Sequence, residues 1–132
     1  MRVGLLRKVG VATAVYGVAV VVWPGVLGRA SGLADDESTR VSLRPVGWRD
    51  AAGGAAMALA PEGPALRVAA GLRIAADFGD AALLGMTLPD RGRRRAAVAV
   101  SVGWGALSVA GLLWPEGHDG VSRRRRRAGS SR

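Results

Sequence analysis

Three charged residues stand in the middle of an apolar segment, in the stretch LRIAADFGDAAL, residues 72–83. Arg73, Asp77 and Asp80 follow the spacing i, i+4, i+7, which places them on one face of a helix. A charge at the centre of a membrane helix costs roughly 2.5 to 3.5 kcal/mol, so all three should face protein or water. Intramembrane carboxylates are typical of proton or cation relays, but they also form ion networks that fix neighbouring helices in register.

Two further charges, Arg49 and Asp50, lie in the preceding apolar segment. The sequence PEGP, residues 61–64, predicts a tight turn between the two segments, so their helices should pack as an antiparallel hairpin. Such a hairpin brings Arg49 to the depth of Asp80. We therefore predict one intramembrane charge cluster, which consists of Arg49, Asp50, Arg73, Asp77 and Asp80. Its three aspartates exceed its two arginines, so one carboxyl is protonated or another donor reaches the cluster.

The two arginines can neutralise the carboxylates, and this favours a structural ion network over a relay. A small proton- or cation-coupled transporter that uses Asp77 and Asp80 is the alternative. The spans contain few hydroxyls, the single histidine, His118, follows the last span, and there is no cysteine. We therefore predict no enzyme activity, no cofactor and no metal site.

Four apolar segments must position these charges: residues 9–27, 46–60, 68–88 and 96–114. The first and last contain no charge over 19 residues, about the length that crosses a bilayer. The composition is 49% hydrophobic with one Phe and one Tyr, and the net charge of +9 gathers at the ends of the apolar segments. The sequence predicts an all-α integral membrane protein with four transmembrane helices in an up-down bundle, as a single domain over residues 1–115.

The first segment has a second interpretation. A basic start, an apolar stretch and small residues up to Ala30 are also typical of a secretory signal peptide cleaved near that position. The absence of a secreted globular domain after it favours a retained helix.

The connecting segments are polar. We expect a loop over residues 28–45 and a disordered, Arg-rich tail over residues 116–132. The tail and the loops should bind anionic lipid head groups, and no nucleic acid is expected as a partner. In the tail five residues face the lipid: Arg123, Arg124, Arg125, Arg126 and Arg127. The distribution of positive charge favours cytoplasmic termini, and we expect the protein in the bacterial inner membrane.

Small residues predict where helices approach closely. Gly71, Ala75 and Gly79 recur at four-residue spacing, and two glycine pairs, Gly53 with Gly54 and Gly103 with Gly105, occur in other spans. A homo-oligomer or another membrane protein is a further possible partner.

The stretches LRPVGWRDAAGGAAMAL, APEGPALR and GLRIAADFGDAALLG, in this order, carry a resemblance. Over about residues 25–113 the chain resembles a family of small, uncharacterised four-helix membrane proteins of high-GC bacteria. That family has Arg-Asp at the start of its second helix and Arg-x-x-x-Asp-x-x-Asp in its third. The resemblance implies the same architecture, places its charged motif on Arg49, Asp50, Arg73, Asp77 and Asp80, and implies no activity.

Overall fold

A computed structural model describes residues 1–25 and 37–115, and over these residues the chain is all-α, with four long helices and no strand. The helices are α1 (Val3–Val22), α3 (Glu37–Leu59), α4 (Pro64–Thr87) and α5 (Arg91–Leu113). At about 1.5 Å per residue, each helix is roughly 30 to 36 Å long. The predicted all-α class is confirmed.

Local sequence explains where α4 and α5 begin. Gly63 has a φ of 107°, a backbone conformation that favours glycine, and Pro64 follows at the start of α4, where a missing N–H costs nothing. The Asp90 side chain caps α5, because its Oδ1 accepts a hydrogen bond from the Arg93 N–H at 2.7 Å. Both helices end two residues before a proline, and the C-cap residue precedes that proline in the dipeptides Leu88-Pro89 and Trp114-Pro115.

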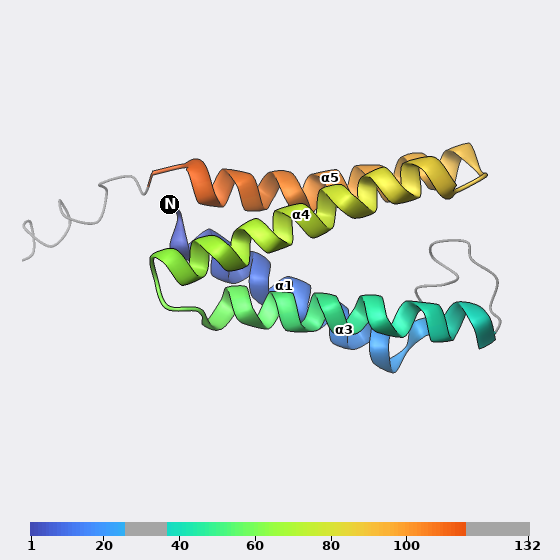
Figure 1. Cartoon of the computed structure of the whole chain (residues 1–132), viewed down its shortest axis with the longest axis horizontal. Helices are drawn as coiled ribbons and strands as arrows, with labels where there is room; N and C mark the ends of the chain where they lie inside the picture. Colours follow the sequence, from blue (N-terminus) through green and yellow to red (C-terminus); the bar gives the residue numbers. More distant parts are fainter. Residues whose placement is uncertain (26–36, 116–132) are drawn as a thin grey trace, which may run out of the picture.

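The four helices form two antiparallel pairs (Figure 1). α1 packs most closely on α3, and α4 packs most closely on α5, whereas α1 touches α5 and α3 touches α4 more lightly. The predicted hairpin of α3 and α4 has its short turn, but these two helices diverge from the turn towards the far end of α4 (Figure 1). The network described below therefore lies between two helix pairs.

The two pairs are joined at the end where α1 begins and α5 finishes. Between the pairs, the Arg2 N–H donates to the Gly111 carbonyl of α5 at 2.7 Å. Within the first pair, Arg7 Nη1 donates to the Ala58 carbonyl of α3 at 2.6 Å. Arg7 thus caps the C-terminal carbonyls of α3 from α1. The apolar core lies at the same end and consists of Leu6, Val9, Met57, Leu66 and Ala70.

Glycines allow α1 and α3 to approach at backbone distance. A Cβ atom at Gly10 would lie 2.8 Å from the Gly54 carbonyl oxygen, and one at Gly17 would lie 2.6 Å from the Gly47 oxygen. On each helix the two glycines are seven residues apart, so they fall on one face. This glycine seam, Gly10, Gly17, Gly47 and Gly54, was not predicted as a set.

Several glycines that were predicted to pack against other helices have no neighbouring helix beside them in the structure. Gly54 and Gly105 do lie against neighbouring helices, but a Cβ at Gly53, Gly71, Gly79 or Gly103 would meet nothing within 4 Å. The close-packing role predicted for those four positions is wrong, because they lie on the outer faces of their helices.

The helices also extend beyond the predicted apolar spans. α3 begins at Glu37, so residues 37–45 are helical and the loop predicted for this part of the chain is wrong. α1, α4 and α5 likewise begin before residues 9, 68 and 96. Hydropathy marks only the apolar part of a helix, whereas Arg, Lys and Glu are good helix formers and continue the backbone hydrogen bonding. Residues 28–36, the cleavage site near Ala30 and the tail over 116–132 lie outside the described residues.

Two helices, Val3–Val22 and Arg91–Leu113, are long and apolar enough to cross a membrane by length and composition. α3 and α4 are long enough but hold more charges in their apolar parts: Arg44, Arg49 and Asp50 in α3, and Arg73, Asp77 and Asp80 in α4.

Candidate functional site

The five predicted residues of the charge cluster lie together in the structure. Arg49 and Asp50 come from the middle of α3, and Arg73, Asp77 and Asp80 come from one face of α4. Hydrogen bonds join them in the order Asp80, Arg49, Asp50, Arg73, Asp77, with alternating charge. We refer to this set as the ionic network.

The inner end of the ionic network is buried. Arg73 forms a two-point contact with Asp77, through Nε to Oδ2 at 3.0 Å and through Nη2 to Oδ1. Its remaining terminal nitrogen, Nη1, donates to Asp50 Oδ1 at 2.9 Å. The side chains of Asp77, Asp50 and Arg73 are 2%, 7% and 8% exposed. Charge-assisted bonds of this bidentate kind are the strong ones, and they offset part of the cost of burial.

The outer end reaches the surface of the bundle. Arg49 makes a second two-point contact, with Asp80, at 2.9 Å to Oδ1 and 2.5 Å to Oδ2. The side chains of Arg49 and Asp80 are 41% and 28% exposed. Arg49 also donates to Asp50 Oδ1 at 3.2 Å from Nε and 3.0 Å from Nη2. Asp50 Oδ1 therefore accepts from both arginines and connects the two ends.

One residue from each of the other two helices lies near the network. Gly105 was predicted as a packing glycine but not as a neighbour of these charges, and Tyr16 was not predicted. The Tyr16 hydroxyl of α1 is close enough to interact electrostatically with Asp50, Arg73 and Asp80. On α5, a Cβ at Gly105 would lie 3.3 Å from the Asp77 Cβ and 3.0 Å from the Phe78 ring. Gly105 therefore lets α5 cover the inner end. The sequence shows only that Tyr16 is the single tyrosine and lies among aliphatic residues of the first span.

Geometry restricts what this site can do chemically. In the described part of the chain every buried side-chain N or O atom has a hydrogen-bond partner. Over the same residues, no group of three or more His, Cys, Asp or Glu side chains is placed to hold a metal ion. Each aspartate is paired with an arginine, so the arrangement can hold helices together, and only its outer end can exchange a proton or ion with the surroundings.

The predicted polybasic residues are not part of this site. Arg123, Arg124, Arg125, Arg126 and Arg127 lie outside the described residues. A second basic group is described at the start of α5 and consists of Arg91, Arg93, Arg94 and Arg95.

Comparisons of the chain with protein-family models, with curated proteins and with solved structures found no match. The resemblance to a family of small four-helix membrane proteins therefore stays a prediction from the sequence.

Proposed function

We propose that this chain is a four-span integral membrane protein with a structural or accessory role, in which the ionic network holds the two helix pairs together. The observation that carries the proposal is the reversed distribution of polarity. Charged Asp50, Arg73 and Asp77 are buried, whereas large apolar side chains such as Val15 and Leu72 are 65% and 68% exposed. In soluble proteins charged side chains are mostly exposed and large apolar side chains mostly buried, whereas lipid is the solvent that suits an apolar exterior.

The same distribution supports membrane spans for α3 and α4, despite their charges. On α4, Arg73 and Asp77 are buried inside the bundle, and Leu72, Leu83 and Met86 on the outer face are exposed. A charge that faces a partner of opposite sign avoids most of the roughly 2.5 to 3.5 kcal/mol that it would cost at the centre of a lipid-facing helix. We place the spans near residues 9–27, 46–60, 68–88 and 96–114, with both termini on the cytoplasmic side of the inner membrane.

A structural role follows from where the network lies. α3 belongs to one helix pair and α4 to the other, and these two helices otherwise touch lightly. The apolar core joins the pairs near the first turns of α1 and α4. The ionic network joins them again further along, where Arg73 contacts Asp50. Two separate attachments fix both the separation and the rotation of the two pairs.

One observation favours a second function, that of a small proton- or cation-coupled carrier. Arg49 and Asp80 are partly exposed at mid-helix, where a purely structural pair would be covered. If water reaches this position, Asp80 can gain and lose a proton while Asp77 stays locked to Arg73.

Cysteine labelling distinguishes the two functions, because the chain has no native cysteine. Ala76 lies one helical turn before Asp80, on the same face, and the neighbouring Ala75 is exposed on the apolar outer face. A membrane-impermeant maleimide requires a hydrated thiolate. Ala76→Cys and Ala75→Cys should both stay unlabelled in native membranes if the network is a dry structural lock.

Three control cysteines, at positions 62, 91 and 75, show how labelling at position 76 is to be interpreted. Cysteines at Glu62 and Arg91, at opposite ends of the bundle, should each be labelled from one side of the membrane and thereby report the topology. Labelling at position 76 but not at 75 would show an aqueous path and support the carrier. Labelling at position 75 as well would show that α4 lies in water, which contradicts four spans.

A further inference from the structure

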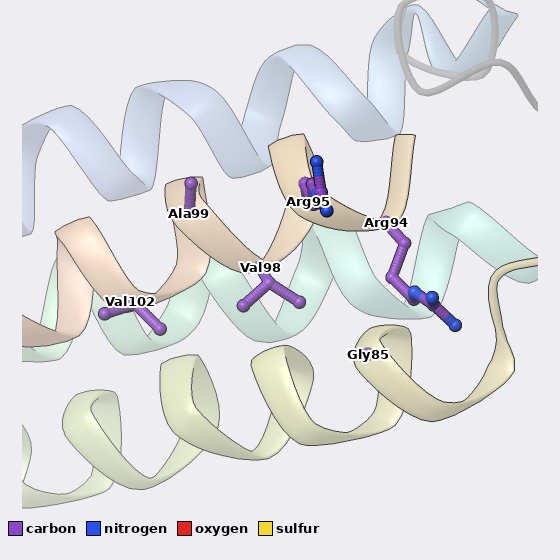
Figure 2. A pocket seen from close by; sticks show the side chains of 6 residues that line it. All are labelled: Gly85, Arg94, Arg95, Val98, Ala99 and Val102. Atoms are coloured by element: carbon purple, nitrogen blue, oxygen red, sulfur yellow. The ribbon is translucent and has the colours of Figure 1, made fainter. Parts of the chain in front are cut away.

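A shallow groove of about 440 Å³ runs along α5 beside the last turns of α4 (Figure 2). Val98 and Val102 extend from α5 towards α4, and Arg94 extends to the end of α4 at which Gly85 lies (Figure 2). The lining consists of Gly85, Arg94, Arg95, Val98, Ala99 and Val102.

Gly85 opens this groove. A Cβ atom there would lie 3.5 Å from Val98 Cγ2, which is an ordinary contact, and would meet no backbone. At Gly54, in contrast, a Cβ would collide with the backbone of α1. Gly54 is therefore required for helix packing, whereas the missing side chain at Gly85 leaves space beside Val98.

Charge and apolar surface are separated along the groove. Arg94 and Arg95 lie at one end, in the first turns of α5, and the rest of the lining is apolar as far as Val102. Neither arginine forms an ion pair with an acidic residue in the described ranges, 1–25 and 37–115. From Arg94 to Val102 the helix rises about 12 Å, close to the roughly 15 Å depth of one hydrocarbon leaflet.

A second groove provides a contrast. It has a volume of about 530 Å³, lies between α3 and α4, and is lined only by apolar residues: Ala56, Ala60, Pro64, Ala65, Val68, Ala69 and Leu72. This groove can accept an acyl chain but has no group that distinguishes one lipid head group from another. Of these two grooves between described residues, the one at Gly85 combines an apolar surface with cations at one end.

We propose that the groove at Gly85 is a binding site for an acidic phospholipid. The phosphate pairs with Arg94 and Arg95, and one acyl chain lies along Val98 and Val102 in the space beside Gly85. The inference rests on the proposed membrane location and deepens it, because it assigns a lipid class to one described surface. Guanidinium groups suit this role, since their planar donors match phosphate oxygens.

The test uses the full-length protein, purified in detergent and titrated with phosphatidylglycerol or phosphatidylcholine of identical acyl chains, with bound lipid counted by native mass spectrometry. Wild type should prefer phosphatidylglycerol by about fivefold or more, the ratio that one arginine near a lipid surface provides. Gly85→Leu fills the groove, so the first tightly bound lipid should be lost. Gly79→Leu, on the open outer face of the same helix, is the matched control and should bind as wild type.

A second pair of variants tests the head-group contact without filling the groove. Arg94→Gln with Arg95→Gln should abolish the preference for phosphatidylglycerol, whereas Arg2→Gln with Arg67→Gln, an equal loss of charge on exposed residues at the other end, should keep it. Equal losses in both double variants would show non-specific attraction and overturn the proposal, as would unchanged binding by Gly85→Leu.

Extraction of membranes with alkaline carbonate separates this proposal from the one on which it rests. If carbonate releases the protein, both fail. If the protein stays in the membrane but the variants bind lipid as wild type does, the lipid site alone is wrong.

Discussion

Arg73 Nη1 lies 2.9 Å from Asp50 Oδ1, although the two residues are 23 positions apart in the sequence. This contact is the point at which the first helix pair is bonded to the second through buried charges. The same Asp50 oxygen accepts from Arg49, so the buried and exposed ends of the network share one atom. A change at the inner end therefore affects the anchoring of both helices.

Arg73→Met should destabilise the protein strongly. Methionine fills similar space but leaves Asp77 without its partner and removes one of the two partners of Asp50. Removal of one partner from a buried ion pair costs about 3 to 5 kcal/mol. The measurement is thermal unfolding of the detergent-purified protein. Arg67→Met, at an exposed position on the same helix, is the control and should change the midpoint little. Equal midpoints for the two variants would contradict a structural role for the network.

The two carboxylates of α4 should respond differently to neutralisation. Asp77→Asn removes the charge that faces Arg73 in a site where the aspartate is 2% exposed, and the expected cost is about 3 kcal/mol or more. The Asp80 side chain is 28% exposed and its partner Arg49 is 41% exposed. Exposed ion pairs contribute only about 0 to 1 kcal/mol to the free energy of unfolding, so Asp80→Asn should cost little. Expression yield and unfolding midpoint should therefore fall much further for the first variant. The reverse order would show that the outer end, and not the inner end, holds the helices.

The network was predictable from sequence because two constraints agree: the helical spacing of the charged residues and the free-energy cost of exposing them to lipid. The positions 73, 77 and 80 can only lie on one face of a helix, and the price of exposing them to lipid directs that face inward. The PEGP turn then brings α3 beside α4, so Arg49 had to meet Asp80. Each step is local, and the described structure reproduces it.

The partner of α3 was not predictable in the same way. Gly10 and Gly17 are two of 20 glycines, and nothing in their spacing identifies them as packed while Gly71 and Gly79 are open. Which small residues lie in a seam depends on how two helices rotate against each other, and that rotation is set by every contact along the crossing. Tyr16 was missed for the same reason, since its approach to the network depends on the rotation of α1.

The glycine seam predicts opposite effects for two adjacent glycines of α3. A Cβ at Gly54 would overlap the Ala14 backbone nitrogen and lie 2.6 Å from the Gly10 carbonyl oxygen, whereas one at Gly53 would meet nothing within 4 Å. Gly54→Ala should therefore force α1 and α3 apart at a cost of about 1 to 3 kcal/mol, as overpacked cores do. Gly53→Ala should be neutral or stabilise by up to about 1 kcal/mol, because alanine is the better helix former.

Thermal unfolding of both variants in one detergent checks this pair, and a cysteine crosslink reports the geometry. Cysteines that replace Ala14 and Ala51, which lie on the facing sides of α1 and α3, should form a disulfide in the wild-type background on oxidation. The crosslink should be retained with Gly53→Ala and reduced with Gly54→Ala, because a disulfide tolerates little change in the distance between its backbone positions. Retention with both variants, together with equal unfolding midpoints, would show that α1 and α3 do not approach at backbone distance in the membrane.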